Sequence, residues 1–326
     1  MASAAELPTA TALARAVDVL RRGGLLGLPT ETVYGLAADA ENEIAVRRIF
    51  AVKGRPSTHP LIVHLGQADA VREWVARLPR EAESLAAAFW PGPLTLVLPR
   101  STRASDAVTG GQGTVAVRVP AHPVAQAVLR AFAGGLAAPS ANRFGRVSPT
   151  RAEHVVADLG CDVDLVLDGG PSSVGVESTI VDLSEGPPAL LRPGGVTREA
   201  LEEVLGHPLP SRVTHGVRAP GMLPSHYAPR AGLVLADRSD AGRVAAQLMA
   251  SGRRVAVCGP VGVPIPTGAV HVSAPDDVQA LARSLYDVLR AVDAGGVDVA
   301  VVVTPEEAGL GLAVLDRLRR AAAPRG

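Results

Sequence analysis

The chain has 326 residues, of which 47% are hydrophobic and 20% charged, a balance typical of a globular protein with two domains. Its 32 basic and 32 acidic residues cancel, so no global positive field gathers nucleic acid, and weak or no direct RNA binding is expected. No apolar run reaches the length of a membrane span and no signal peptide is recognisable, so we expect a cytoplasmic protein without membrane attachment.

Periodicity in the first two thirds of the chain predicts helices and strands of one α/β domain. Helices are expected over residues 11–22, 43–52, 68–89, 123–133 and 151–159. Strands are expected in LLGL, LIVHL, LTLVLP, TVAVRVP, DLVLDGG and ESTIVDL.

The last third has a different organisation. Residues 211–230 follow no regular period, carry Pro220, Gly221, Pro224 and Pro229, and indicate an extended linker. Strands GLVLA, RRVAVCG and VDVAVVVTP then alternate with helices over 240–251, 275–294 and 310–322. This alternation predicts a small parallel α/β domain, and no GxGxxG or P-loop motif points to a nucleotide cofactor in it.

Cysteine and lysine usage carries chemical information. Cys161 and Cys258 lie far apart and outside any CxxC or Cys/His cluster, so we expect inert thiols and no protein-held metal. Lys53 is the single lysine in a chain that otherwise uses arginine. Because lysine is a compact point charge and arginine a planar fork, Lys53 indicates a chemical requirement, with chance survival at a surface site as the alternative.

Several short motifs combine hydroxyls, amides and cations. In LPTETVYGL, Thr30, Thr32 and Tyr34 follow a buried strand and could line a small polar pocket, or form a turn. In KGRP, Lys53 and Arg55 would point the same way along an extended segment and grip a polyphosphate, unless they are a solvated pair.

Three further motifs lie later in the chain. Ser140 and Asn142 of PSAN offer neutral donors that suit phosphate or adenine, and Ser148 or Thr150 could instead cap the helix over 151–159. A hairpin between ESTIVDL and LLRPG would bring Ser178 and Arg192 to one edge.

Together, PTETVYGL, KGRP, HPLIVH, PSAN, STIVDL and LRPG resemble the YrdC-type domain of threonylcarbamoyl-AMP synthases, while PGM, HYAP and GLGLAVLDRLRRAA resemble the linker and C-terminal domain of the long form. The resemblance implies a YrdC-type twisted open mixed sheet with helices over 1–212, a linker or lid over 213–230, and a small Rossmann-like parallel α/β domain over 231–326.

Site residues follow from the resemblance, position by position. ATP contacts are implied for Lys53, Arg55, His59, Thr114, Ser140, Asn142, Ser148, Arg192 and Tyr227, with Lys53 and Arg55 also catalytic. Threonine contacts are implied for Thr32, His64, Arg118, Ser178 and, by its backbone, Ala138. His59 stands where many relatives have asparagine.

The implied reaction joins L-threonine, bicarbonate and ATP, with Mg²⁺ carried by the nucleotide, into threonylcarbamoyl-AMP and pyrophosphate. The product would pass to downstream proteins that modify tRNA. One alternative is an RNA-binding module, which the neutral charge and 3% aromatic content disfavour. A second is a hydrogenase-maturation carbamoyltransferase, which would be larger and hold zinc-finger cysteines. A third is a structural protein, which leaves Lys53 unexplained.

The linker generates one structural hypothesis. Its prolines, with a methionine, a histidine and Tyr227, are unlike a passive tether, so residues 213–230 are expected to close over the pocket with Tyr227 on the nucleotide. The alternative is a surface strap that only fixes the second domain.

Overall fold

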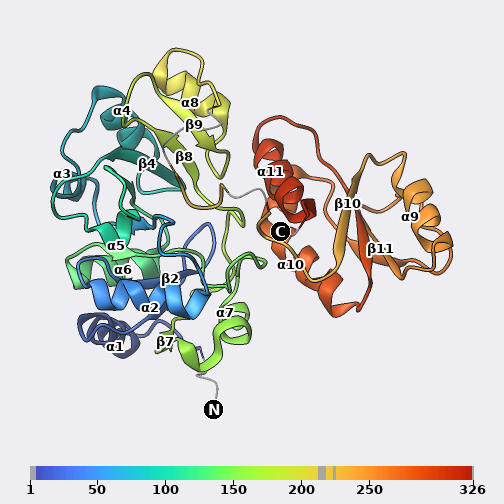
Figure 1. Cartoon of the computed structure of the whole chain (residues 1–326), viewed down its shortest axis with the longest axis horizontal. Helices are drawn as coiled ribbons and strands as arrows, with labels where there is room; N and C mark the ends of the chain where they lie inside the picture. The colour runs from blue at the N-terminus through green and yellow to red at the C-terminus, as the bar shows by residue number, and fades with distance from the viewer. Residues whose placement is uncertain (1–4, 212–217, 223–224, 325–326) are drawn as a thin grey trace. The chain divides into compact units, whose positions relative to one another are not determined.

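The computed structural model describes residues 5–211, 218–222 and 225–324 (Figure 1). The chain divides into two compact units. The first comprises Met1–Phe144, Ser148–Ser173 and Glu177–Met222, and the second comprises Gly145–Val147, Val174–Val176 and Leu223–Gly326.

The first unit is built on a mixed β-sheet. Its strands are β1 (Leu26–Leu28), β2 (Gly35–Asp39), β3 (Ile62–His64), β4 (Leu94–Pro99), β5 (Thr114–Arg118), β6 (Leu136–Ala137), β7 (Leu165–Val166), β8 (Thr179–Asp182) and β9 (Ala189–Arg192). They lie in the order β7-β1-β2-β6-β3-β5-β4-β8-β9. The sheet contains both parallel pairs, such as β3 with β5, and antiparallel pairs, such as β4 with β5, as expected for an open mixed sheet.

Eight helices accompany this sheet among the described residues, with two short 3₁₀ turns. They are α1 (Ala10–Arg21), α2 (Glu43–Lys53), α3 (Val71–Trp74), α4 (Arg80–Phe89), α5 (Asp106–Thr109), α6 (Pro123–Phe132), α7 (Ala152–Leu159) and α8 (Arg198–Leu205). The 3₁₀ turns are Ala68–Ala70 and Gly160–Asp162.

One face of the sheet is covered along its length. Alternate residues such as Leu36, Val63, Val117, Leu96 and Val181 point to this face and join a core with α2, α3, α4, α5, α7 and α8. Burial of these aliphatic side chains is the main driving force for folding of this unit.

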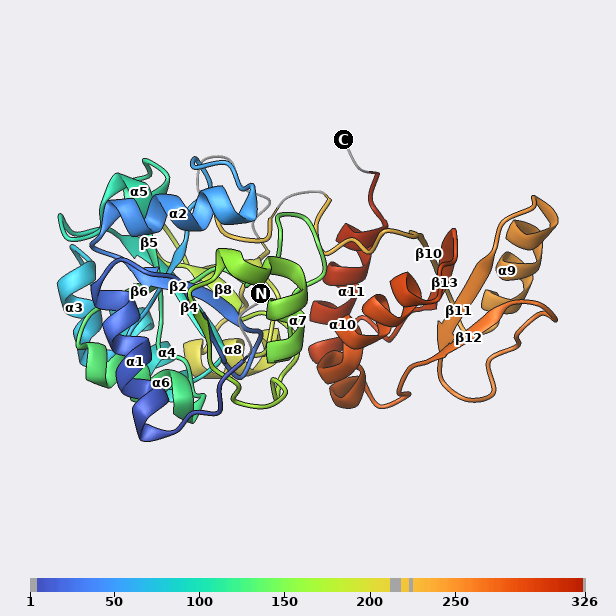
Figure 2. The same ribbon diagram turned by 90° about the horizontal axis from the view of Figure 1, so that it is seen from below.

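The opposite face is covered by helices over only part of its width. Helices α1 and α6 lie side by side and pack on β1, β2, β6 and β7 (Figure 2). Beyond them, the residues Ile62, Ala116, Val97, Ile180 and Leu191 form what we call the apolar floor.

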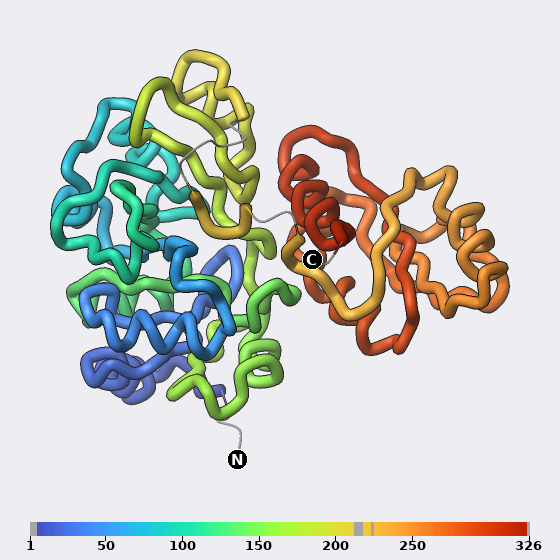
Figure 3. Tube along the Cα trace, viewed as in Figure 1, coloured from blue at the N-terminus to red at the C-terminus, as the bar shows by residue number. Residues whose placement is uncertain are grey.

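A short described piece of the linker, residues 218–222, packs on this floor, and we call it the covering segment. Ala219 is buried there with Met222 beside it, and the path of the segment can be followed in Figure 3. The side-chain amide of Gln112 pairs with the backbone of Arg218 in both directions, at 2.7 and 3.1 Å. The half-face without helices is therefore sheltered by a loop that turns at Pro220 and Gly221.

The second unit holds a four-stranded parallel sheet of order β10-β13-β11-β12. Its strands are β10 (Gly232–Ala236), β11 (Val255–Gly259), β12 (Val270–Ser273) and β13 (Val299–Val303), and its helices are α9 (Ala241–Ala250), α10 (Val278–Ala294) and α11 (Leu310–Ala322). The loop residues 145–147 belong to this unit, where Arg290 Nη2 donates to the carbonyl of Val147 at 3.1 Å.

The predicted fold class is confirmed, and some predicted elements are wrong. The helix expected over 68–89 is broken, because Pro79 begins α4 and the chain before it is extended at Val75. Strands β2 and β12 and helix α8 were not predicted. Helix α7 is capped at Arg151 without a side-chain hydrogen bond, so Ser148 and Thr150 are not its caps.

Within the described ranges, no helix combines the length and apolar character needed to cross a membrane.

Candidate functional site

A row of polar side chains crosses the helix-free half-face. Register pairs His64 on β3 with Arg118 on β5, and Arg118 with Thr95 on β4. Paired residues point to the same side of a sheet, and each of these lies two positions from a residue of the apolar floor. All three are nearly inaccessible to solvent, so we call His64, Arg118 and Thr95 the polar row.

Arg118 is held by the loop that follows β1. Its Nη2 donates to Glu31 Oε1 at 2.7 Å, its Nη1 to Thr32 Oγ1 at 2.8 Å, and its Nε to the carbonyl of Gly92 at 3.2 Å. A guanidinium has five N–H donors, so these bonds leave two for a ligand. The charge of Arg118 is compensated by Glu31, and the site can still bind a further carboxylate.

The Glu31 carboxylate is ionised although it is 95% buried. Burial raises the pKa of Glu31, but the charge and hydrogen bond of Arg118, with smaller help from the backbone N–H groups of Ala121 and of Glu31 itself, bring it below its ordinary value. Glu31 Oε2 accepts no hydrogen bond from the described residues.

His64 is neutral in the polar row. Burial, and next the positive charge of Arg118, lower the pKa of His64 to about 3. Its Nδ1 lies 3.3 Å from the carbonyl oxygen of Ile62, which can only accept, so Nδ1 carries the proton and Nε2 is an acceptor. A buried neutral imidazole here can accept a hydrogen bond from a hydroxyl or an amine.

The row continues into the β8–β9 hairpin predicted from the sequence. Ser178 Oγ lies 2.7 Å from Thr95 Oγ1, and Arg192 Nη2 donates to Ser178 Oγ at 3.1 Å and to its carbonyl at 2.8 Å. Arg192 Nη1 also donates to the carbonyl of Pro220, at 2.9 Å. Arg192 thus links the site hydroxyl to the covering segment.

Lys53 has a different geometry from the one predicted. It ends α2, and Gly54 follows in the left-handed conformation, with φ 65°, so Lys53 and Arg55 do not extend along one face. Lys53 Nζ instead donates to the carbonyls of Ser140 and Asn142, at 2.5 and 2.6 Å, and lies 3.3 Å from Asn142 Oδ1. Three acceptors match the three donors of an ammonium group, so Lys53 fixes the PSAN loop by its backbone.

Burial makes this ammonium group costly. Burial, and then the neighbouring charge of Arg55, hold the pKa of Lys53 well below its ordinary value. The place of Lys53 suits a compact ammonium group, because its three donors converge on two carbonyl oxygens and one amide oxygen of a single loop, whereas a planar guanidinium directs its donors differently.

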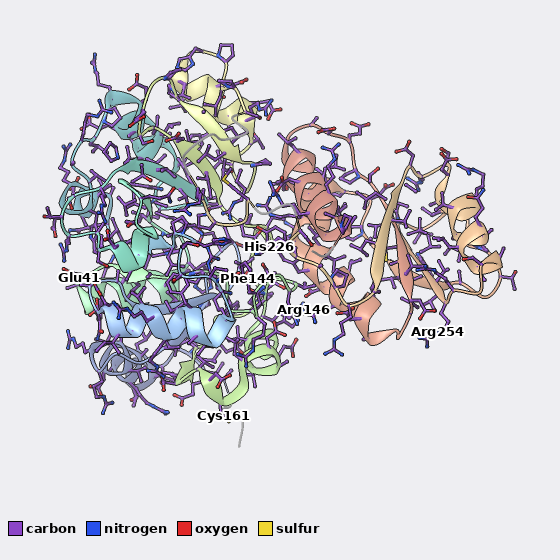
Figure 4. All side chains as sticks on the ribbon, in the orientation of Figure 1. Glu41, Phe144, Arg146, Cys161, His226 and Arg254 are labelled. Carbon is purple, nitrogen blue, oxygen red and sulfur yellow. The ribbon has the colours of Figure 1, made fainter. Side chains whose placement is uncertain are left out.

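Arg55 and His59 both contact the ring of Phe144. Phe144 is labelled in Figure 4. Arg55 Nη2 donates to the carbonyl of Pro60 at 2.9 Å, and its Cζ lies 5.9 Å from the ring centroid of Phe144. His59 makes an edge contact with the same ring, at 5.7 Å between centroids. Burial, followed by the charges of Arg55 and Arg218, lowers the pKa of His59.

Thr114 lies at the opposite end of β5 from Arg118. It begins β5, four residues before Arg118, and a strand advances about 3.3 Å per residue, which separates the two by roughly 13 Å. Thr114 and Arg118 therefore mark opposite ends of the apolar floor.

Four other predicted residues take part in hydrogen bonds within the first unit. Ser140 Oγ donates to Asn142 Oδ1 at 2.6 Å, and Ser148 Oγ donates to Glu177 Oε1 at 2.7 Å. The backbone N–H of Ala138 donates to the carbonyl of Ile62 at 3.1 Å. Ala138 follows β6, which pairs with β3, and its partner Ile62 lies two residues before His64 on β3.

Two tyrosines lie elsewhere. The hydroxyl of Tyr34 donates to the carbonyl of Gly170 at 2.8 Å and accepts from Gly169 N–H, so Tyr34 is a core residue and does not line the pocket. Tyr227 is described within the second unit, 5.9 Å between ring centroids from Tyr286 and 5.2 Å from the guanidinium carbon of Arg317.

The lid hypothesis over 213–230 rests in part on residues 213–217 and 223–224, which lie outside the described residues. The contact of Tyr227 with a nucleotide stays a prediction.

Sequence reasoning missed two members of the site. Glu31 is a single acidic residue within a hydroxyl-rich loop, and Thr95 is the one polar residue in the apolar strand LTLVLP. An isolated polar residue in an apolar strand is a signal that could have been used, because burial of a hydroxyl requires a partner.

The described residues contain neither a metal-binding cluster nor paired cysteines. Among the residues the structure describes, no three His, Cys, Asp or Glu side chains gather to hold a metal ion. Neither cysteine forms a disulfide. Cys161 is exposed, and Cys258 is buried, which raises its pKa to about 12.

Comparison with known proteins shows which family models and relatives the chain matches. Residues 18–194 match the Sua5–YciO–YrdC family model, described as telomere recombination, and residues 196–323 match the model of the threonylcarbamoyl-AMP synthase C-terminal domain. A threonylcarbamoyl-AMP synthase of Pyrococcus abyssi is 44% identical over 95% of this chain and 94% of its own length. The Bacillus subtilis protein of the same name is 40% identical over 96% and 93%.

A solved structure agrees with these sequence matches. The crystal structure of Pyrococcus abyssi Sua5 complexed with L-threonine superposes with a TM-score of 0.91 at 42% identity, and the match covers 95% of this chain and 94% of the other.

Lys53 can be tested by substitution. Lys53→Ala removes hydrogen bonds to two backbone carbonyls and leaves them buried, so we expect a loss of about 1–3 kcal/mol in stability together with a strong loss of activity. Thermal unfolding and turnover should be measured side by side for Lys53→Ala, Lys53→Arg and the exposed control Arg47→Ala. Wild-type stability and turnover in Lys53→Arg would contradict a requirement for a compact ammonium group.

Because His64 is buried in its neutral form, we predict that the stability of the protein falls in acid. Its pKa is lowered in the folded protein, so below about pH 6.5 the unfolded chain binds a proton that the folded chain does not. Stability is therefore lost as the pH falls from 6.5 towards 3, by about 2–3 kcal/mol at pH 4.5 from this residue alone. Unfolding of wild type and His64→Gln at pH 7 and 4.5 measures this. An equal loss in both proteins would show that His64 is not buried in the neutral form.

Proposed function

The chain belongs to the threonylcarbamoyl-AMP synthase family, and we propose that it is a nucleotidyltransferase that converts L-threonine, bicarbonate and ATP into threonylcarbamoyl-AMP and pyrophosphate. The product is the first intermediate in the threonylcarbamoyladenosine modification of tRNA. The observation that carries the assignment of substrates is the polar row with its Glu31 and Ser178 partners, buried at one end of an apolar floor that continues along β5 towards Thr114.

The polar row suits a small hydroxy amino acid. Arg118 has spare N–H donors for a carboxylate. His64 Nε2 and Ser178 Oγ are atoms that can hydrogen-bond an amine or a hydroxyl. The related Pyrococcus abyssi protein was crystallised with L-threonine, which supports L-threonine as the ligand of this end, with Thr32 and Ala138 beside it.

The other end suits a nucleotide. Arg55, His59 and Thr114 would meet the phosphates, with Ser140, Asn142, Ser148, Arg192 and Tyr227 as the remaining ATP contacts carried over from the family. Lys53 would act here chiefly by fixing the loop of Ser140 and Asn142, since its own donors are already used. Fixed donors of this kind stabilise charge that develops on phosphate oxygens.

The chemistry requires positioning more than a nucleophilic side chain. The neutral amine of threonine attacks the carbon of bicarbonate and water leaves, which gives a carbamate. A carbamate oxygen then attacks the α-phosphorus of ATP, and the bond to the β-phosphate breaks to release pyrophosphate. Because a carbamate decomposes in water, the shelter of the apolar floor by the covering segment suits both steps.

Mg²⁺ enters this proposal with the nucleotide. The described residues of the phosphate end are cations and neutral donors rather than a set of carboxylates, which fits an ion held by the phosphates of ATP. Such an ion would neutralise charge on the phosphate oxygens.

The balanced charge of the chain supports weak or no direct contact with tRNA. Separate transfer proteins would then use the product, and we propose that the enzyme works in the cytoplasm.

Substrate dependence tests the assignment. We expect pyrophosphate release to require both L-threonine and bicarbonate, with serine a poor substitute and valine a much poorer one, because a site that pairs the substrate hydroxyl rejects analogues without it. Release of pyrophosphate and capture of labelled bicarbonate in an adenylate should be measured with each amino acid. Equal turnover of valine and threonine would overturn the assignment.

A further inference from the structure

Glu31 has a buried carboxylate oxygen that the fold does not use. Its Oε1 accepts from Arg118, while Oε2 is shielded from solvent and accepts no hydrogen bond from a described residue. An unpaired buried carboxylate oxygen costs free energy, and native structures keep such a group only where it has another purpose. Its place in the site gives that purpose, since Glu31 and Thr32 both contact the guanidinium of Arg118.

The charges of Arg118, Glu31 and His64 determine which kind of ligand could donate a hydrogen bond to Glu31 Oε2. Arg118 and Glu31 form a neutral pair, and the only other ionisable group in the polar row, His64, is neutral. A simple anion would leave Glu31 uncompensated, and a simple cation would leave Arg118 uncompensated. A zwitterion satisfies both, because its carboxylate can take the spare N–H groups of Arg118 while its ammonium group donates to Glu31.

We propose that Glu31 is a substrate-binding residue, and that its Oε2 accepts a hydrogen bond from the α-ammonium group of the amino acid substrate. The inference rests on the proposed function and assigns a role to a residue outside the set predicted from the sequence. It explains why an acidic residue stands in a site that must also attract a carboxylate and phosphates. It also orients the nitrogen, which must lose a proton before it attacks bicarbonate as the neutral amine.

The structure offers an alternative that any test must separate. Glu31 could act only through Arg118, by holding its guanidinium in place. In that case its loss would weaken every ligand that uses Arg118, whether or not the ligand has an amine. Removal of the amine from the ligand therefore distinguishes a direct contact from a supporting one.

The experiment is a two-by-two binding measurement on the full chain. Wild type and Glu31→Gln, which keeps the size of the side chain, are titrated calorimetrically with L-threonine and with (R)-3-hydroxybutyrate, the same molecule without its amine. Glu41→Gln is the matched control, because Glu41 forms an exposed ion pair with Arg103 in the same unit. Thermal unfolding of each variant establishes that it is folded.

We expect wild type and Glu41→Gln to bind L-threonine about 10- to 100-fold more tightly than the analogue, as befits one charge-assisted hydrogen bond. In Glu31→Gln this ratio should fall close to one, chiefly through weaker binding of threonine. Equal weakening of both ligands, or unchanged binding of threonine, would overturn the inference and leave the proposed function intact. If wild type itself does not bind threonine, the proposed function fails as well. If Glu31→Gln does not fold, the ratio is measured with Glu31→Asp, which retracts the carboxylate and is expected to lower it.

Discussion

The site depends on the compensation of one buried charge, the guanidinium of Arg118. A buried cation is tolerated only when its charge is compensated, and here the partners come from distant parts of the sequence. Glu31 and Thr32 come from the loop after β1, and Gly92 precedes β4. The requirement to pair Arg118 thus fixes two loops against the end of the sheet and keeps His64 neutral beside it.

A second constraint is the incomplete helical cover of the sheet. Helices α1 and α6 protect one part of this face, and the covering segment packs on the apolar floor of the other. A loop outside regular secondary structure leaves backbone groups to be paired, and Arg192 and Gln112 pair with those of Pro220 and Arg218. Arg192 therefore couples the covering segment to Ser178 through direct hydrogen bonds.

Sequence patterns predicted what depends on local periodicity. The amphipathic helices, the alternation of strands and helices in the second unit and the β8–β9 hairpin follow from spacing that neighbouring residues impose. Predictions failed where a single residue overrode the pattern. Pro79 divides a long amphipathic stretch, and Gly54 turns the chain so that Lys53 and Arg55 diverge.

The site was only partly predictable, for a related reason. Motifs indicated which residues matter, but not that Lys53 binds backbone carbonyls or that Glu31 pairs with a residue 87 positions away. Such pairings are set by strand order in the sheet, which one sequence does not reveal. The roles given to the ATP contacts come from the family and not from spacing.

The most direct test of this account is a crystal structure of the protein with L-threonine and a non-hydrolysable ATP analogue. The account predicts threonine at the polar row, its carboxylate on Arg118, and the phosphates about one strand length away near Arg55 and Thr114. Threonine bound away from Arg118, or phosphates at the His64 end of the floor, would contradict it.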